Sequence, residues 1–259
     1  MANKPLHPED ILPWLDRRDV RLELHRVLSS TNDRARELAR AGAPALTLVV
    51  AEEQTAGRGR QGRPFFSPAG TGVYMSLLLR PERLDRPEQI TAAAAVAAAR
   101  AVEHISGRAA DIKWVNDVYV DGRKTVGILT EAGATADGAA WAVLGIGVNL
   151  LPPEGGFPDE LAGIAGAVLP IGGQEVRGRL IACILNEFMT LYPGAAEQTL
   201  LAEYRRRDFL HGKEVYIIQN QAEEKVLAVG IDDAFRLIVR RADGTAMHLN
   251  AGEVHIKPL

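Results

Sequence analysis

Short apolar runs bounded by turn residues recur through the first third of the chain and predict strands. They occupy Val20–Leu28, Leu46–Ala51 and Gly72–Leu79, and each is shorter than a typical buried helix. Between the first two runs, Asp33–Arg40 has apolar residues on one helical face, and Ser29–Asn32 offers hydroxyl and amide caps before it. Strands and helices are therefore expected to share one domain.

Three longer segments predict further helices. The alanine-rich segment Glu88–Ile105 is expected to pack closely on a sheet through its small side chains, which indicates a structural role. A connector rich in proline and glycine, Leu151–Gly173, precedes two more helices at Glu175–Tyr192 and Ala195–Phe209.

The middle of the chain predicts consecutive hairpins. Asp121-Gly122 and Asp137-Gly138 are typical of tight turns between antiparallel strands. Because consecutive hairpins place neighbouring strands side by side, we expect Lys113, Lys124 and Asn149 within one small area of sheet.

The composition changes at Gly212, beyond which short strands are expected at 214–218, 225–231 and 235–240. Strands of this length and spacing within roughly 50 residues predict a small barrel. We therefore expect a leader with one helical turn at 1–20, a main domain at 21–211 and a small C-terminal domain at 212–259.

The composition is that of an ordinary globular protein. Of 259 residues, 47% are hydrophobic and 24% are charged, and the formal net charge is −3. This charge argues against a general nucleic-acid or membrane-surface binder. The single cysteine, Cys183, lies in an apolar run and is expected to be a buried small hydrophobe. With no internal disulfide, no signal core and no membrane-length apolar run, the sequence indicates a cytoplasmic protein.

The densest chemistry lies in one loop, Gly57–Arg63, which holds three glycines and three arginines. Glycines let a backbone approach a ligand closely, and guanidinium groups offer charge and forked donors to phosphate or carboxylate. The loop fits G-x-G-x-x-G, but the dinucleotide fingerprint needs a helix after its last glycine. Pro64 and Pro68 argue against that helix. A nucleotide-binding loop and a solvated basic loop both remain open.

Two glycines, Gly145 and Gly147, lie inside the strand that ends the second hairpin. Glycine within a strand marks a bulge, a close approach of the backbone to a ligand, or an accommodation of packing. The sequence leaves these three interpretations open.

Several familiar reaction centres are missing from the sequence. No two histidines have metal-ligand spacing and there is no C-x-x-C, which argues against a zinc site. There is no G-x-S-x-G nucleophile elbow either. The cations and amides around the glycine loop suit reactions that depend on positioning and charge stabilisation, such as phosphoryl or nucleotidyl transfer.

Four features in sequence order resemble one family. They are Ser30-Thr31-Asn32; Gln54 with the loop Gly57–Arg63; Lys113-Trp114-Val115-Asn116-Asp117 with Lys124 and Gly127-Ile128-Leu129; and Gly145–Asn149. Each is weak alone, but the ordered combination, with Gly252-Glu253-Val254 near the end, resembles the biotin protein ligases from about Val20 to the C-terminus. Without a winged-helix segment, the chain resembles the short form that ligates and does not repress transcription.

The resemblance implies an α+β fold: a mixed, largely antiparallel sheet packed with helices, as in class II aminoacyl-tRNA synthetases and biotin–lipoate ligases, plus a small SH3-like barrel. It also implies a two-step reaction that uses ATP, Mg²⁺ and biotin. The biotin carboxylate attacks the α-phosphate of ATP to give biotinyl-5′-AMP and pyrophosphate. A lysine amine on the biotin carboxyl carrier protein domain of a carboxylase, such as acetyl-CoA carboxylase, then attacks that mixed anhydride and AMP leaves.

The resemblance also assigns residues to ligands. Biotin is expected to contact Ser30, Thr31, Asn32, Gln54, Gly57, Arg58, Gly59, Arg60, Trp114, Lys124, Gly127 and Gly145. ATP is expected to contact Arg60, Arg63, Phe65, Asn116, Asp117, Lys124 and Asn149.

The expected catalytic residues are Lys124, Arg60 and Asp117. Lys124 and Arg60, with Arg63, would offset the repulsion between two anionic reactants and stabilise charge on the phosphate. Asp117 would accept the proton of the carrier lysine or, like Asn149, help to hold Mg²⁺. Structural roles stay open for two residues, because Trp114 could be core and Asp117 could cap a hairpin.

Four residues depart from the family pattern. Gln61 replaces a frequent arginine, so the loop has one charge fewer. Phe65 replaces a frequent tryptophan, which keeps an aromatic face and loses an indole donor. Val115 replaces the proline of K-W-P-N-D, and Lys257 lies where some members have an arginine whose fork a lysine does not reproduce.

Two other functions fit parts of the pattern. A lipoate or octanoate ligase would share the fold and the carrier-lysine chemistry, but would need a longer apolar tunnel and no polar partners for a ureido group. A non-catalytic module could recognise an anionic partner through the loop, but this would leave Lys124 without a role. Strand edges in this fold can pair two chains, which favours a homodimer or a weak monomer–dimer equilibrium, and no nucleic acid or membrane partner is expected.

Overall fold

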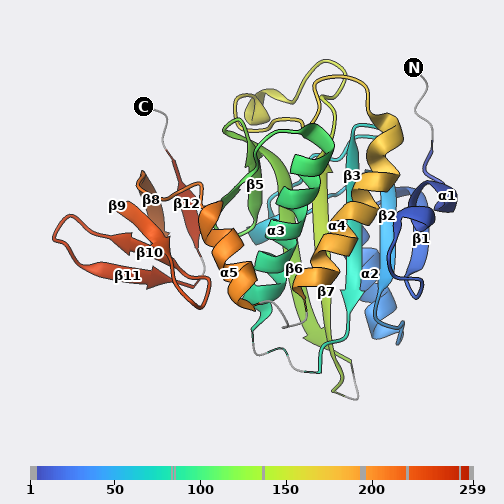
Figure 1. The fold of residues 1–259 in the computed structure, drawn as a ribbon, viewed down its shortest axis with the longest axis horizontal. Helices are drawn as coiled ribbons and strands as arrows, with labels where there is room; N and C mark the ends of the chain where they lie inside the picture. Colours follow the sequence, from blue (N-terminus) through green and yellow to red (C-terminus); the bar gives the residue numbers. More distant parts are fainter. Residues whose placement is uncertain are drawn as a thin grey trace.

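The computed structural model describes residues 5–82, 84, 86–135, 138–192, 197–219, 222–250 and 252–256. A seven-stranded sheet covered by helices forms the main unit, and a second, five-stranded sheet lies towards the C-terminus (Figure 1). The main strands are β1 (Arg21–Leu28), β2 (Thr47–Gln54), β3 (Gly72–Leu79), β4 (Asp111–Lys113), β5 (Asp117–Val120), β6 (Arg123–Ala134) and β7 (Ala140–Asn149). The helices are α1 (Pro8–Ile11), α2 (Thr31–Arg40), α3 (Pro87–Ser106), α4 (Arg177–Leu191) and α5 (Glu197–Arg206).

The main sheet has the order β1-β2-β3-β7-β6-β5-β4. β1 and β2 run parallel, and the other neighbouring pairs run antiparallel, which confirms the predicted mixed, largely antiparallel sheet. The hairpin between β5 and β6 turns at Asp121 (φ 49°) and Gly122 (φ 72°), the left-handed pair that a two-residue turn requires.

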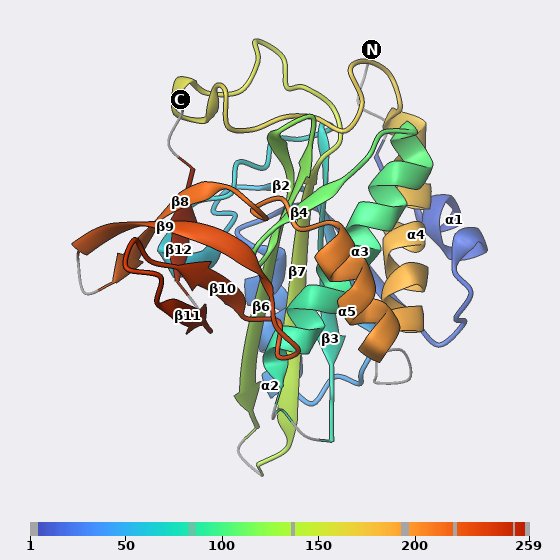
Figure 2. The same ribbon diagram turned by 60° about the vertical axis from the view of Figure 1, so that its left-hand side comes forward.

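Each face of the sheet has its own core, because side chains alternate along a strand. On one face lie α3 and α4, side by side in Figures 1 and 2, and the alanines of α3 are fully buried there as expected. On the other face α2 packs through Ala35 and Ala39 onto Val49, Leu78 and Val143.

The start of α2 differs from the expected cap. Ser30 occupies the N-cap position but makes no capping hydrogen bond with its side chain. The backbone N–H of Thr31 instead donates to Oε1 of Gln54 at 2.9 Å. The prediction of a local hydroxyl cap was therefore wrong, because a side chain distant in sequence satisfies this donor.

The N-terminal segment packs onto the main unit. Ile11 and Leu15 are almost fully buried in the core. A Cβ on Gly178, at the start of α4, would collide with the backbone of Asp10, so α1 lies directly against that helix. Within the residues described, no helix is long and apolar enough to span a bilayer.

The C-terminal sheet has the order β11-β10-β9-β8-β12 and is antiparallel throughout. Its strands are β8 (Glu214–Gln219), β9 (Ala222–Ile231), β10 (Leu237–Arg240), β11 (Ala246–Leu249) and β12 (Glu253–His255). The strand expected from Phe235 begins only at Leu237, because Phe235 has φ 58°. Trp114 joins the two units by donating its indole N–H to the carbonyl of Phe235 at 2.9 Å.

Candidate functional site

The sheet face that α2 covers continues past the start of that helix, and there its side chains become smaller and more polar. Along β7, alternate residues on this face run from Val143, in the α2 core, to Gly145, Gly147 and Asn149. Large apolar side chains therefore give way to glycines and an amide. A cavity of about 430 Å³ lies over this part of the sheet.

The structure brings nearly all the predicted site residues to this one cavity. The predicted residues that line it are Ser30, Thr31, Asn32, Gln54, Arg58, Gly59, Arg60, Arg63, Phe65, Trp114, Asn116, Asp117, Lys124, Gly127, Gly145 and Asn149. Lys113 lines it too, so the expectation that Lys113, Lys124 and Asn149 share one area is confirmed.

Gly57 does not line the cavity and lies buried under the loop. A Cβ on this residue would lie 2.5 Å from the carbonyl of Phe65 and 2.7 Å from Oγ of Ser67. The loop closes on itself here, because Phe65 N–H donates to the Gly57 carbonyl at 2.8 Å and Gly59 N–H to the Arg63 carbonyl at 2.7 Å. The absence of a side chain at Gly57 permits this closure.

The strand glycines accommodate side chains of the site itself. Gly127 of β6 lies directly opposite Gly147 of β7, and a Cβ on either would press into the ring of Phe65. A Cβ on Gly145 would collide with the amide of Asn32. The ladder has no register shift at these residues. In this structure the glycines therefore mark close packing and not a bulge.

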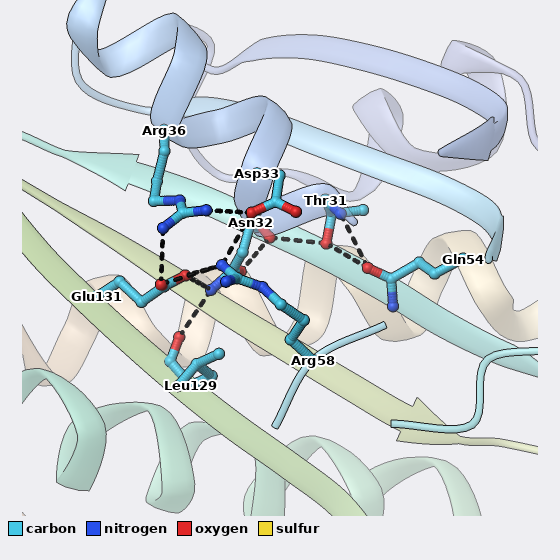
Figure 3. A network of polar contacts seen from close by, with 9 residues as sticks. Thr31, Asn32, Asp33, Arg36, Gln54, Arg58, Leu129 and Glu131 are labelled. Carbon is cyan, nitrogen blue, oxygen red and sulfur yellow. Dashed lines mark hydrogen bonds and ion pairs between the residues drawn. The ribbon is translucent and has the colours of Figure 1, made fainter. Parts of the chain in front are cut away.

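Thr31, Asn32 and Gln54 line one end of the cavity and belong to a chain of polar groups, part of which is drawn in Figure 3. Oγ of Ser76 donates to Oδ1 of Asn32 at 2.6 Å and lies 2.8 Å from Oγ1 of Thr31. Thr31 contacts Oε1 of Gln54, whose amide donates to Ser67 at 2.9 Å. Ser76 is fully buried, so this chain is fixed before any ligand binds.

Sequence reasoning missed Ser76, although a signal was present. After Tyr74, Ser76 is the one polar residue in the rest of β3, which is otherwise methionine and leucine. A buried hydroxyl needs a partner, and the strand register places Ser76 beside Gly145, where Asn32 reaches it.

Lys124 lies at the opposite end of the cavity, because it stands near the start of β6, whereas Leu129 and Glu131, which contact Asn32, lie further along that strand. Nζ of Lys124 lies 2.7 Å from Oδ1 of Asp117, in an ion pair. The main chain of Lys124 is held by the connector, since its N–H donates to Ile164 and its carbonyl accepts from Gly166, both at 2.9 Å. Four connector residues, not predicted from the sequence, also line the cavity: Phe157, Leu161, Ile164 and Ala165.

Asn116 stands between the arginine loop and the sheet. Its Nδ2 donates to the Ile128 carbonyl at 2.8 Å, and its Oδ1 accepts a bond from Arg60 at 3.3 Å. The preceding Trp114–Val115 peptide bond is cis, where the family motif has proline.

Tyr119 also lines the cavity at this end. Burial raises the pKa of its phenol, and the charge of Asp117 raises the pKa further. The phenol is therefore a neutral donor across the ordinary pH range.

The C-terminal unit completes the cavity wall with Gly252, Val254 and His255, none of which was predicted. Lys257, whose departure from the family pattern was noted, lies outside the described residues. Residues of both sheets therefore surround one cavity.

Comparison with known proteins decides the family. A model of the biotin/lipoate A/B protein ligase family matches residues 24–149. The biotin–[acetyl-CoA-carboxylase] ligase of Paracoccus denitrificans is 36% identical over 229 residues, which cover 83% of this chain and 92% of that protein. The chain belongs to the biotin/lipoate A/B protein ligase family.

Other members of the family differ in length or are more distant. The bifunctional ligase/repressor BirA of Bacillus subtilis is 46% identical over 170 residues, which cover 65% of this chain and 52% of BirA. The chain thus spans about half the length of that relative. The biotin protein ligase of Aquifex aeolicus, solved with biotin and ATP, has a TM-score of 0.74 at 24% identity, covering 91% of this chain and 97% of that one. This likeness confirms the predicted fold.

Proposed function

We propose that the protein is a biotin protein ligase, which activates biotin with ATP and transfers it to a lysine of a biotin carboxyl carrier protein domain. One observation carries the proposal. A single cavity has a buried chain of neutral hydrogen-bonding groups at one end and Lys124 with Arg60 at the other. Biotin has the same polarity, with a neutral ureido group far from its carboxylate.

The neutral end is proposed to bind the ureido group. A ureido group offers two N–H donors and one carbonyl acceptor, and Thr31, Asn32 and Gln54 present both kinds of partner there. An apolar residue on the same face of the sheet as Gly145, Leu129, lines the cavity and would cover part of the hydrocarbon of biotin. An apolar acyl group has no donors or acceptors to match these polar groups, which favours biotin over lipoate as the ligand.

The charged end is proposed to bind ATP and carry out adenylation. A carboxylate oxygen of biotin attacks the α-phosphorus, the bond to pyrophosphate breaks, and biotinyl-5′-AMP forms. Lys124 and Arg60 would stabilise the negative charge on the phosphoryl oxygens as the bond forms. Arg63, Asn116 and Asn149 would contact the nucleotide, and Phe65 would offer its ring.

Transfer completes the proposed reaction. The carrier lysine attacks the anhydride carbonyl carbon, AMP leaves, and the amine loses a proton. Asp117 is proposed as its acceptor, because its carboxylate lines the cavity beside Lys124. Holding the anhydride away from water until then would require the loop Gly57–Arg63 to stay closed.

Magnesium fits the same end. The residues described hold no group of three His, Cys, Asp or Glu side chains that could bind a metal alone, but Mg²⁺ in nucleotide sites uses one or two protein oxygens plus phosphates. Asp117 supplies a carboxylate, whose Oδ1 pairs with Lys124 in this structure, and Asn149 lines the same cavity. These two residues would hold the ion, which when bound neutralises phosphate charge.

A direct assay tests the function. The protein is incubated with ATP, Mg²⁺ and either biotin or lipoate, and pyrophosphate and acyl-adenylate are measured. We expect pyrophosphate release that depends on biotin, followed by labelling of a biotin carboxyl carrier protein domain. Release that depends on lipoate would assign the protein to the other branch of the family, and release with neither acid would reject ligase activity.

A further inference from the structure

A second polar cluster lies beside the neutral end of the cavity, centred on Glu131 of β6 (Figure 3). Its carboxylate accepts from Nη2 of Arg58 at 3.0 and 3.1 Å, from Nη1 of Arg36 at 3.2 Å, and from Nδ2 of Asn32 at 2.8 Å. Asp33 also contacts both arginines, with Oδ1 at 2.9 Å from Arg58. Two carboxylates therefore face two guanidinium groups.

Because of this cluster, Arg58 and Arg60 of the loop have different partners. The charge of Arg58 is met by two carboxylates inside the protein, whereas Arg60 donates a 3.3 Å bond to a neutral amide. A guanidinium held by two carboxylates is a poorer ligand for a phosphate than a cation with one carboxylate partner, such as Lys124, because binding would have to break more charge-assisted bonds. Arg58 is thus suited to hold the loop, and Arg60 to meet the ligand.

Glu131 contacts the loop and the neutral end together. It lies two residues from Leu129 on the same face of β6, and Leu129 is opposite Gly145, where the Asn32 amide packs. A carboxylate only accepts hydrogen bonds, so Glu131 draws Nδ2 of Asn32 toward itself and leaves Oδ1 facing Ser76. The Leu129 carbonyl accepts from the same Nδ2 at 3.4 Å, so Glu131, with the shorter bond, and this carbonyl together set the orientation of the amide.

We propose that Glu131 is a positioning residue that anchors the base of the arginine loop through Arg58 and orients Asn32 for the ureido group. The ordering of the loop Gly57–Arg63 and the affinity for biotin then both depend on the carboxylate of Glu131. The proposal rests on the proposed function for its biotin part, while anchoring of the loop is independent of the ligand.

The test compares Glu131→Gln with Glu37→Gln, a matched change on an exposed carboxylate of α2 that pairs with Arg34. Pyrophosphate release gives KM for biotin and kcat, and limited trypsin digestion of the ligand-free protein reports cleavage after Arg58 and Arg60, since Pro64 blocks cleavage after Arg63. For Glu131→Gln we expect KM for biotin to rise about tenfold, with kcat within about threefold. Loop cleavage should be several-fold faster, and Glu37→Gln should match the wild type.

A double-mutant cycle with Arg58→Met tests the coupling. Arg58→Met removes a tryptic site, so the cycle compares cleavage after Arg60, which every variant keeps. If one contact carries both effects, the double variant is cleaved there no faster than the worse single variant. Additive effects, or a Glu131→Gln protein with wild-type KM and cleavage, would overturn the proposal. Arg58→Lys, which keeps charge and loses the fork, should also loosen the loop and serves if Glu131→Gln does not fold. A wild type without biotin-dependent pyrophosphate release would reject the proposed function, and the cleavage comparison would still test the anchor.

Discussion

The two ends of the cavity are built in opposite ways. At the neutral end, Thr31, Asn32 and Ser76 are buried and joined to Gln54 by hydrogen bonds within the protein. At the charged end, Lys124 remains 29% exposed and pairs with one carboxylate. The contrast teaches that a neutral ligand group can be met by a rigid, prearranged surface. A highly charged ligand instead meets cations that can exchange protein partners for phosphate.

The largest loss is expected from the charged end. Lys124→Ala should reduce biotin-dependent pyrophosphate release on the order of 10²–10³, the scale for removing one prearranged charge donor. Lys225, an exposed lysine of β9 paired with Glu214, provides the control, and Lys225→Ala should leave the rate unchanged. An unaltered release rate in Lys124→Ala would remove this residue from the adenylation step.

Arg60 should separate catalysis from retention of the intermediate. Arg60→Gly removes a guanidinium from a loop that is already rich in glycine, so biotinyl-AMP should dissociate roughly 10- to 100-fold faster, as for the loss of one charge-assisted bond. The leaked anhydride should then label lysines on an unrelated protein. Dissociation of the adenylate is measured by rapid dilution, and retention equal to the wild type would contradict a closing role for the loop.

The neutral end should respond in affinity more than in rate. Ser76→Ala leaves Oδ1 of Asn32 buried without its donor, which costs about 1–3 kcal/mol. We expect KM for biotin to rise about tenfold with a smaller change in kcat, together with a lower melting temperature. Ser106→Ala, which removes a hydroxyl bonded to Val102 at the end of α3, is the control, and an equal KM in the two variants would show that Ser76 has no bearing on biotin.

The smallest effect is expected where the two ends meet. Gly147→Ala would push the Phe65 ring off its glycine platform, and overpacking of this kind costs about 1–3 kcal/mol. We expect a rise of about threefold in KM for ATP, measured by pyrophosphate release. Combining Gly147→Ala with Phe65→Leu should restore much of the free energy of unfolding that Gly147→Ala loses. No recovery would mean that the added methyl group acts elsewhere.

The features predicted well from the sequence are those with a local signal. Alternating and continuous apolar runs predicted the strands, the tight turn at Asp121-Gly122 predicted a hairpin, and the order of hairpins predicted the meeting of Lys113, Lys124 and Asn149. Each of these follows from the period of a strand or the geometry of a turn. The loop Gly57–Arg63 was also found from its composition alone.

The features missed depend on contacts between distant segments. Gln54 replaces Ser30 as the cap of α2 only because β2 ends beside that helix. Glu131 has no unusual sequence neighbours, and its meaning follows from register with β7 and from the approach of Arg58. Val254 reaches the cavity because the C-terminal sheet lies against Trp114. None of these relations has a fixed spacing along the chain.

The connector that flanks Lys124 limits where the chain can be altered. The Ile164 carbonyl accepts from the N–H of Lys124, and the N–H of Gly166 donates to the Lys124 carbonyl. These two bonds tie a surface segment to the reactive end of the cavity. Surface segments of this composition are ordinarily favoured for inserting tags or reporters. Here an added residue between Leu161 and Val168 would shift the position of Lys124, so labels for imaging or capture belong in the exposed turn at Asp243-Gly244 of the C-terminal sheet.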